Sequence, residues 1–256
     1  MIHPSAIIHS GASVADDVEV GPFSVIGEQV TIGAGTKIGS HAVIEGQTSI
    51  GKNNTIFHHV SIGEIPQDKK YRNEDTTLTI GDDNVIREFC SFNTGTIQDR
   101  ANTFVGNNNW IMAYVHVAHD CVIGNNVIFA NCVQLGGHII VQDNVFLGGF
   151  TGVHQFCRIG AHAMSGVGSV VLADVPPFVT VMGNKAKPHG INTEGLKRLG
   201  YNRAVIADIK MAYKIIYRSS LTLEEAIERM KTEMVNSASV KKIIEFIDGS
   251  KRSIVR

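Results

Sequence analysis

An aliphatic residue recurs at every sixth position of this chain of 256 residues. The series runs without a break through residues 2–62 and returns in the same phase over 80–92. A second series, displaced by one residue, covers 105–171 and is interrupted only by Ser165. A period of six fits neither an isolated amphipathic helix nor a simple alternating strand. It indicates short flat faces joined by tight corners, with one aliphatic side chain of each face pointing into a continuous core.

Three such hexads close one triangular coil of about 18 residues, and successive coils stack about 4.8 Å apart like neighbouring strands of a sheet. We therefore predict an all-β solenoid, a parallel β-helix, over residues 1–184. Glycine follows the inward residue at positions 21, 27, 33, 39, 51 and 63. We interpret these glycines as corner residues whose backbone angles are unfavourable for other residue types.

Two segments leave the repeat. Residues 64–79 depart and rejoin in the same phase, whereas residues 93–104 shift the phase by one. Such loops are either tolerated insertions on the surface or one wall of a binding site. The pattern alone leaves both interpretations open for each loop.

The repeat ends at residues 174–178, DVPPF, where two adjacent prolines are expected to prevent another coil. We expect a linker over 183–190 and helices after it. Apolar residues at helical spacing over 205–217 follow Asn202 as an N-cap, and Thr222 with Glu225 forms a capping box. With a further helix expected near 239–248, residues 185–256 are predicted to form a small α-helical C-terminal domain.

The net charge of −1 conceals two segments of opposite sign. Residues 1–184 carry a net charge of −8 and residues 185–256 carry +7. The basic C-terminal segment indicates an acidic partner, unless it only reflects the greater use of Lys and Arg in helices. The four cysteines form no CxxC pair, which favours reduced, buried thiols. Without an apolar run of about 18 residues or a signal peptide, we expect a cytoplasmic protein with no membrane span and no nucleic-acid partner.

Candidate chemistry gathers where stacking brings polar residues of successive coils together. His119, Gly137 and Gln155 share one hexad position, and Asp120 and His138 share the next. A histidine beside an aspartate suits a general base, because the carboxylate orients the ring and stabilises its cation. The backbone N–H of Gly137 is suited to stabilise an oxyanion.

A purely structural interpretation is that these histidines form hydrogen-bonded ladders along the solenoid, which we expect for His41, His58 and His59. The clustering around His119 favours a functional role there. Cys121 lies near His119, but its hexad position is one that small, packed side chains fill. We therefore do not expect a cysteine nucleophile.

Several segments together resemble the bacterial UDP-N-acetylglucosamine acyltransferases, over essentially the whole chain. They are the hexads, GEIPQDKKY, YVHVAHDCVIG, GGFTGVHQFCRIGAH and NTEGLKR. The resemblance implies a left-handed β-helix that forms a homotrimer with active sites between neighbouring subunits. It implies transfer of a 3-hydroxyacyl group from acyl carrier protein to the 3-hydroxyl of UDP-N-acetylglucosamine, the first step of lipid A biosynthesis, with no metal or other cofactor. The acyl chain length, and the 3-amino analogue as an alternative acceptor, stay open.

The resemblance also implies roles for individual residues. His119 matches the general base, Asp120 its partner and Gly137 the oxyanion donor. Positions around the sugar and the acyl donor match Gln67, Asp68, Lys70, His116, His138 and His154. Nucleotide-binding positions match Gln155, Asn192, Glu194 and Arg198, where a guanidinium suits phosphate.

Three positions depart from the family pattern. Asn93 stands where the family commonly has histidine, and Leu199 where it commonly has a second arginine. Val167 stands where long-chain members have glycine, so we expect it to limit the acyl chain. These departures concern donor length and phosphate contacts, and they leave the class of enzyme unchanged.

Other functions of the same fold remain to be separated. Another hexapeptide-repeat acyltransferase is one alternative, although the helical tail and NTEGLKR suit acetyl-CoA-dependent members poorly. A zinc carbonic anhydrase with three histidines across subunits is a second, and a non-catalytic scaffold is a third.

Overall fold

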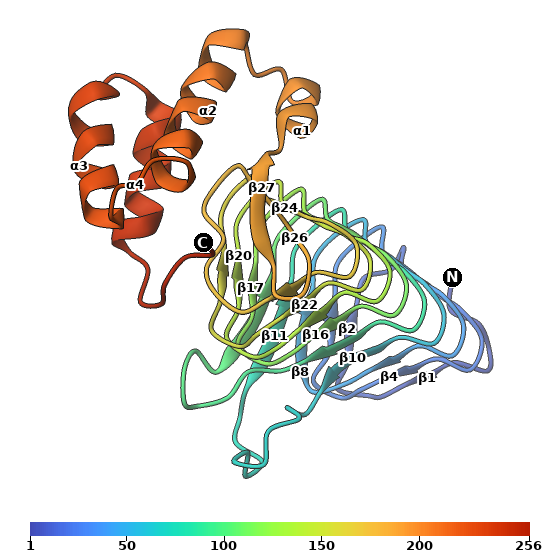
Figure 1. Cartoon of the computed structure of the whole chain (residues 1–256). Coiled ribbons are helices and arrows are strands. Elements are labelled where there is room, and N and C mark those ends of the chain that lie inside the picture. Colours follow the sequence, from blue (N-terminus) through green and yellow to red (C-terminus); the bar gives the residue numbers. More distant parts are fainter.

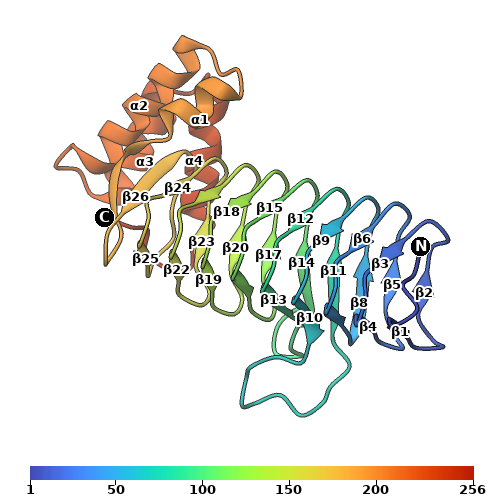
Figure 2. The same cartoon turned by 90° about the vertical axis from the view of Figure 1, so that its right-hand side faces the viewer.

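The computed structural model describes residues 1–256. The chain winds into a triangular stack of coils, and four helices lie against the end of the stack opposite the N-terminus (Figure 1). The coils rise one above the next along a single axis (Figure 2). Each coil contributes one short strand to each of three faces, and the coil strands within a face run parallel to one another.

The first face holds nine strands, in which every neighbouring pair is parallel. They are β1 (Ile7–Ile8), β4 (Val25–Ile26), β7 (Val43–Ile44), β10 (Ser61–Glu64), β13 (Ser91–Asn93), β16 (His116–Val117), β19 (Gln134–Leu135), β22 (Gly152–Val153) and β25 (Val170–Val171).

The second face holds eight parallel strands. They are β2 (Ser13–Val14), β5 (Thr31–Ile32), β8 (Gln47–Ile50), β11 (Thr77–Ile80), β14 (Asn102–Val105), β17 (Val122–Ile123), β20 (Ile140–Val141) and β23 (Arg158–Ile159).

The third face holds ten strands and ends in the one antiparallel pair, β26 with β27. They are β3 (Glu19–Val20), β6 (Lys37–Ile38), β9 (Thr55–Ile56), β12 (Val85–Ile86), β15 (Trp110–Ile111), β18 (Ile128–Phe129), β21 (Phe146–Leu147), β24 (Met164–Ser165), β26 (Val179–Met182) and β27 (Lys187–Ile191).

The core of the solenoid consists of the inward aliphatic residues. From Val20 to Val171 these positions are buried, whereas Ile2 is 46% exposed because no coil lies below it. Ser165 is fully buried, and its hydroxyl is satisfied: Oγ lies 2.8 Å from Thr151 Oγ1 and accepts from the Gly148 N–H at 3.0 Å. The one polar interruption of the repeat is therefore accommodated without an unpaired polar atom.

The corners correct our interpretation of the glycines. Gly21, Gly33 and their equivalents do not adopt positive φ, with Gly63 (φ +83°) the exception. A Cβ on Gly21 would lie 2.7 Å from the carbonyl carbon of Gly39, so close stacking of coils excludes a side chain there. Left-handed angles occur three positions after the inward residue and are adopted by non-glycine residues such as His41 (φ 55°) and Asp120 (φ 60°).

The end of the solenoid also differs from expectation. Val175, just before the two prolines, bridges to Ile159, and Val181, after them, pairs with Ser165. The coil that contains the prolines is therefore completed, and the repeat ends one strand later than expected. The expected linker over 183–190 is partly strand, because β27 turns back along β26. The loops outside the strands are 65–76 and 94–101, slightly shorter than expected, and both project from the same corner (Figure 1).

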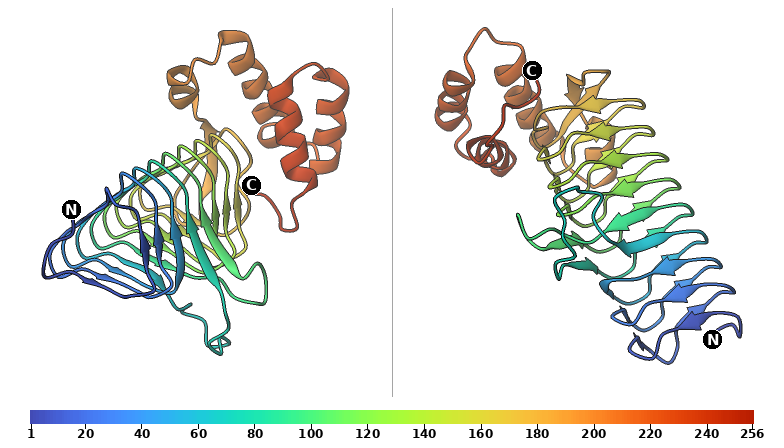
Figure 3. Two further views of the ribbon diagram at one scale, coloured as in Figure 1. Left: turned by 180° about the vertical axis from the view of Figure 1, so that it is seen from behind. Right: turned by 90° about the horizontal axis from the view of Figure 1, so that it is seen from below.

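Four helices complete the chain: α1 (Thr193–Arg198), α2 (Arg203–Tyr217), α3 (Leu223–Glu233) and α4 (Ala238–Asp248). The caps predicted at Asn202 and Thr222 are present, including both hydrogen bonds of the capping box. Only α1 was not expected as a helix. The guanidinium of Arg158 lies 4.4 Å from the centre of the Phe246 ring and donates to the Phe246 carbonyl at 3.2 Å, which joins α4 to the second face. The helices lie beside the last coils of the solenoid in both views of Figure 3. None of the four helices is both long and apolar enough to cross a bilayer.

Candidate active site

The corner between the first and second faces places His119 and Asp120 between β16 and β17. His119 Nδ1 lies 2.9 Å from Asp120 Oδ2. Asp120 is fully buried and also accepts from the Thr96 hydroxyl at 2.6 Å, from the Thr96 N–H at 3.0 Å and from the Arg100 N–H at 3.3 Å. The loop over 94–101 thus wraps the carboxylate with its main chain and fixes its position.

These contacts keep Asp120 ionised. Burial alone raises the pKa of this carboxyl, but hydrogen bonds from His119 and Thr96 outweigh burial and hold the pKa below its ordinary value. An ionised Asp120 orients the His119 ring with its Nδ1–H toward the carboxylate. Nε2 is then the nitrogen left to exchange protons, and the side chain is 13% exposed.

Gly137 stacks one coil above His119, as the 18-residue register requires. A Cβ at this position would lie 2.6 Å from His119 Cε1 and 2.7 Å from Nε2, so any side chain would displace the ring. The Gly137 N–H donates no hydrogen bond within the chain. A free N–H beside the proton-exchanging edge of a histidine is suited to hold a developing oxyanion.

His138 is held on three sides. Its ring stacks on Phe156 at 4.3 Å and meets the His119 ring edge to face at 4.9 Å. Its Nδ1 lies 2.9 Å from Oδ2 of Asp99, which belongs to the 94–101 loop.

Nδ1 of His116, on the strand before the corner, lies 2.8 Å from Ser91 Oγ. Burial lowers the pKa of His116, so its ring is neutral at cellular pH.

The C-terminal segment reaches the same corner. The guanidinium of Arg252 donates to the carbonyl of Gln155 and lies 3.3 Å from His154 Nδ1. Ser250 binds the Asp174 carboxylate at 2.5 Å, and the Asp174 N–H donates to the Ser253 carbonyl at 3.1 Å. This fastening holds Arg252 over the coil that carries His154 and Gln155.

A hollow of about 870 Å³ opens beside these residues. Both loops, the stacked rings and the C-terminal segment line it, among them Asp68, Lys70, Arg100, His138, Lys251 and Arg252. Its cationic side chains suit a phosphorylated ligand. Asp68 and Lys70 thus share the hollow with His138, whereas Gln67, though in the same loop, does not line it, and neither do His116, His119, His154 and Gln155.

Other predicted residues lie elsewhere on the chain. Asn192 caps α1 through the Gly195 N–H at 3.0 Å and donates to the His162 carbonyl at 3.1 Å. Glu194 pairs with Lys197 on the same helix, and Arg198 ends that helix. Val167 lies at the corner between β24 and β25, where it is 78% exposed. None of these residues lines the hollow beside His138.

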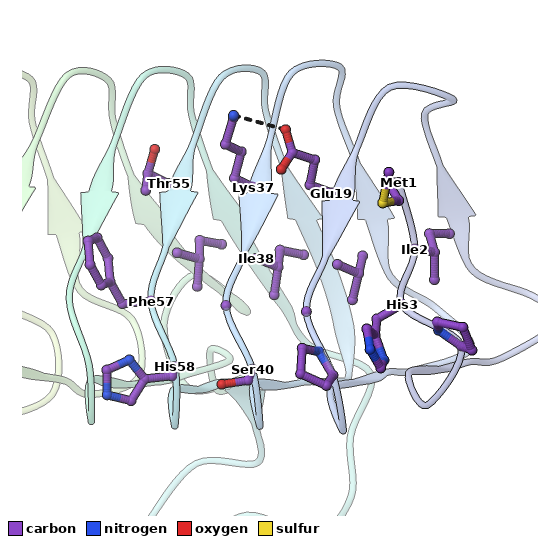
Figure 4. A pocket seen from close by; sticks show the side chains of 16 residues that line it. Met1, Ile2, His3, Glu19, Lys37, Ile38, Ser40, Thr55, Phe57 and His58 are labelled. Atoms are coloured by element: carbon purple, nitrogen blue, oxygen red, sulfur yellow. Dashed lines mark ion pairs between the residues drawn. The ribbon is translucent and has the colours of Figure 1, made fainter.

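Two further features bear on the interpretation of this site. His119, Asp120 and His138 bring metal-ligating atoms within 4.8 Å of one another, but both Nδ1 atoms face carboxylates and Asp120 is engaged by Thr96. The absence of a metal remains a prediction. A second hollow, of about 540 Å³, lies on the third face near the N-terminus, around the Lys37–Glu19 ion pair (Figure 4). No predicted site residue lines it.

The cysteine near the site is not a nucleophile. Cys121 is fully buried, burial raises the pKa of its thiol to about 12, and its Sγ lies 3.2 Å from the Gly136 carbonyl. A neutral thiol enclosed in the core has no access to a substrate. The histidines are therefore the side chains of this corner that are placed to exchange protons with a ligand.

Comparison with known families identifies the chain. Residues 174–255 match the second domain of the UDP-N-acetylglucosamine O-acyltransferases, and 11–46 and 102–137 match bacterial transferase hexapeptide repeats. The acyl-[acyl-carrier-protein]–UDP-N-acetylglucosamine O-acyltransferase of Thiobacillus denitrificans is 58% identical over 100% of this chain and 99% of its own length. The chain belongs to the UDP-N-acetylglucosamine O-acyltransferase family. The resemblance seen in the sequence is thereby confirmed.

Solved structures of UDP-N-acetylglucosamine O-acyltransferases agree with this assignment. The Acinetobacter baumannii structure superposes with a TM-score of 0.97 at 46% identity, covering 100% of this chain and 99% of that one. The Francisella novicida structure gives a TM-score of 0.97 at 42% identity, covering 100% and 94%. The fold is therefore the left-handed parallel β-helix expected, with a small helical C-terminal part. The chain is an acyltransferase, and the scaffold and carbonic anhydrase alternatives are set aside.

Three residues at the site were not predicted. Thr96 and Asp99 lie in the 94–101 loop, which the sequence marked as a departure from the repeat without indicating which side chains turn inward. Arg252 lies 97 residues from Gln155, and no periodic pattern connects the two.

Asn93, one of the departures from the family pattern, lies at the base of the first loop. It is buried, and its side-chain amide donates to the Glu64 and Ile65 carbonyls at 3.3 and 3.0 Å.

Proposed function

We propose that this chain transfers a 3-hydroxyacyl group from acyl carrier protein to the 3-hydroxyl of UDP-N-acetylglucosamine, the first step of lipid A biosynthesis. The names of relatives that match over the whole chain support this donor and this acceptor. The observation that carries the chemistry is the His119–Asp120 pair at 2.9 Å, with Gly137 against the ring. We assign the reaction to the cytoplasm.

The proposed mechanism needs one base and one oxyanion donor. Nε2 of His119 removes the proton of the sugar 3-hydroxyl, and the hydroxyl oxygen attacks the thioester carbonyl. The N–H of Gly137 holds the negative charge that develops on the carbonyl oxygen. The intermediate then expels the thiolate, which takes the proton back from His119, leaving an ester on the sugar and a free thiol on the carrier. Asp120 keeps the ring oriented throughout.

The remaining predicted site residues are assigned to substrate binding. We assign Gln67, Asp68 and Lys70 of the first loop, with His116, His138 and His154, to the sugar and the acyl donor. Gln155 is assigned to the nucleotide side, with Asn192, Glu194 and Arg198. The cationic lining of the hollow supports binding of a diphosphate.

We propose that the active unit is a homotrimer. Asn192, Glu194 and Arg198 lie on or next to α1, away from the hollow beside His138, and Val167 lies at a different corner. One chain therefore presents the two halves of the expected site on separate surfaces. A neighbouring copy related by a closed rotation would bring these surfaces together.

The experiment that tests the function offers purified protein a mixture of 3-hydroxyacyl carrier proteins of different chain length. UDP-N-acetylglucosamine and its 3-amino analogue are the two acceptors, and mass spectrometry identifies the products. We expect an O-acylated UDP-sugar with one dominant chain length. The His119→Ala protein is the matched control. A folded wild-type protein that acylates neither acceptor would refute the proposal, and exclusive N-acylation of the analogue would replace the acceptor.

A further inference from the structure

We propose that Asp99 is a positioning residue that keeps His138 away from Asp120, so that the Asp120 carboxylate serves His119 alone. This inference rests on the proposed function, in which His119 is the general base. Asp99 lies in the 94–101 loop and touches no residue of the His119–Asp120 pair directly. It would act through His138.

The two histidines are competitors for one oxygen. His119 Nδ1 lies 2.9 Å from Asp120 Oδ2, and His138 Nδ1 lies only 3.7 Å from the same atom. That oxygen already accepts from the Thr96 hydroxyl at 2.6 Å and from the Thr96 N–H at 3.0 Å. A further donor would crowd it and weaken the bond that orients His119.

Asp99 removes this competition. Its Oδ2 lies 2.9 Å from His138 Nδ1, so the Nδ1–H of His138 has a carboxylate of its own. The Asp99 side chain is 35% exposed, and Nε of Arg100 lies 3.8 Å from Asp99 Oδ1. Asp68, Lys70, Lys251 and Arg252 line the same hollow as His138. The 94–101 loop therefore positions both side chains. The main-chain N–H groups of Thr96 and Arg100 hold the Asp120 carboxylate, and the Asp99 side chain holds the His138 ring.

His138 cannot escape the competition by turning away. Its ring stacks on Phe156 with an interplanar angle of 6°, and its backbone N–H donates to the His119 carbonyl at 3.0 Å. With the ring held in this plane, loss of Asp99 leaves Asp120 Oδ2 as the nearest acceptor for Nδ1–H. A small tilt would make that contact and pull on the carboxylate behind His119.

The test is a double-mutant cycle between Asp99→Ala and His138→Phe, with kcat and KM measured for all four proteins. Phenylalanine at 138 keeps a ring to stack on Phe156 but removes the competing N–H. We expect Asp99→Ala alone to lower kcat about tenfold, a part of the 10²–10⁴-fold that a positioned base contributes. In the His138→Phe background the same change should leave kcat unaltered. An equal loss in both backgrounds, or no loss in either, would overturn the inference.

A second measurement is independent of turnover. In protein labelled with ¹⁵N-histidine, the Nδ1–H proton of His119 bonded to Asp120 should give a strongly downfield signal. Asp99→Ala should shift it upfield, and adding His138→Phe should restore it. Asp99→Asn, whose amide oxygen still accepts from His138, should keep the signal and most of kcat. An unchanged signal in Asp99→Ala would show that His119 does not sense Asp99.

A control variant tests whether loss of any carboxylate lowers kcat, and activity of the wild-type protein separates the proposed function from the role of Asp99. Asp17→Asn removes an exposed carboxylate from an early coil and should leave kcat unaltered. If the wild-type protein makes no acylated UDP-sugar, the proposed function fails before the cycle is measured. If it does so, but the cycle shows no coupling between Asp99 and His138, only the role of Asp99 is lost.

Discussion

Gly137 lies so close to His119 that a Cβ at position 137 would stand 2.6 Å from Cε1 of the ring. This contact links the residue that supplies the proposed oxyanion N–H to the residue that exchanges the proton. Glycine is therefore needed here for packing against the ring, because its φ is not in the left-handed region.

Gly137→Ala should lower kcat by about 10²-fold or more, because the methyl group displaces the ring and the N–H together. The solenoid should stay folded, since the atoms that the added Cβ would meet belong to the His119 side chain and not to the backbone. Gly152→Ala is the matched control: a Cβ there meets nothing within 4 Å, so activity should be retained. Equal activity of the two variants would argue against a tight fit at position 137.

His119→Ala should lose roughly 10²–10⁴-fold in kcat while the assembly survives, because a positioned general base contributes that much. Asp120→Asn should lose less, since the amide still occupies the same place but no longer carries the charge that stabilises the imidazolium. Steady-state kinetics and size-exclusion chromatography of the two variants measure both points. Near-wild-type turnover by folded His119→Ala would end the proposed mechanism.

Activity should require a homotrimer whose sites combine His119 of one subunit with Arg198 of another. Light scattering should give about three times the chain mass of 27.7 kDa. Mixing inactive His119→Ala and Arg198→Ala subunits and reassembling them should restore about one quarter of the sites, because each such site takes one intact residue from each parent. Mixed trimers that stay inactive, or an active monomer, would show that each chain is self-sufficient.

Periodic features of the molecule could be read from the sequence, and contacts between non-periodic segments could not. The inward position is the same in every hexad, so the three faces, the stack of His119 below Gly137 and the phase shift in the second loop all follow from counting. Asp99 and Arg252 reach the site from segments that have no register with it. The glycines were misread for a related reason, because coil-to-coil distance, which a sequence does not display, decides what fits beside Gly21.

The basic helical part should bind acyl carrier protein electrostatically. The exposed candidates in the basic C-terminal segment are Lys185, Lys187, Lys197, Arg203, Lys210, Lys214 and Arg218. Lys210 and Lys214 follow one face of α2, and Arg218 continues that face as the C-cap of the helix. Raising the ionic strength from low salt to 0.15 M, where the Debye length is about 8 Å, should raise KM for the carrier protein. Charge reversal of the α2 residues should do the same, whereas reversal of Lys52 in an early coil should not. A KM that is independent of salt would remove electrostatic docking.

Val167 should limit the length of the acyl chain. The resemblance in the sequence implies glycine here in long-chain members, and the valine side chain of this protein is 78% exposed at its corner, free to contact a bound chain or a neighbouring subunit. Each buried methylene contributes about 0.8 kcal/mol, and forcing one into an occupied space costs about 1–3 kcal/mol. Two excess carbons therefore reduce kcat/KM about tenfold or more. Val167→Gly, assayed with 3-hydroxyacyl donors of increasing length, should shift the preference to longer chains, and an unchanged preference would place the limit at another residue.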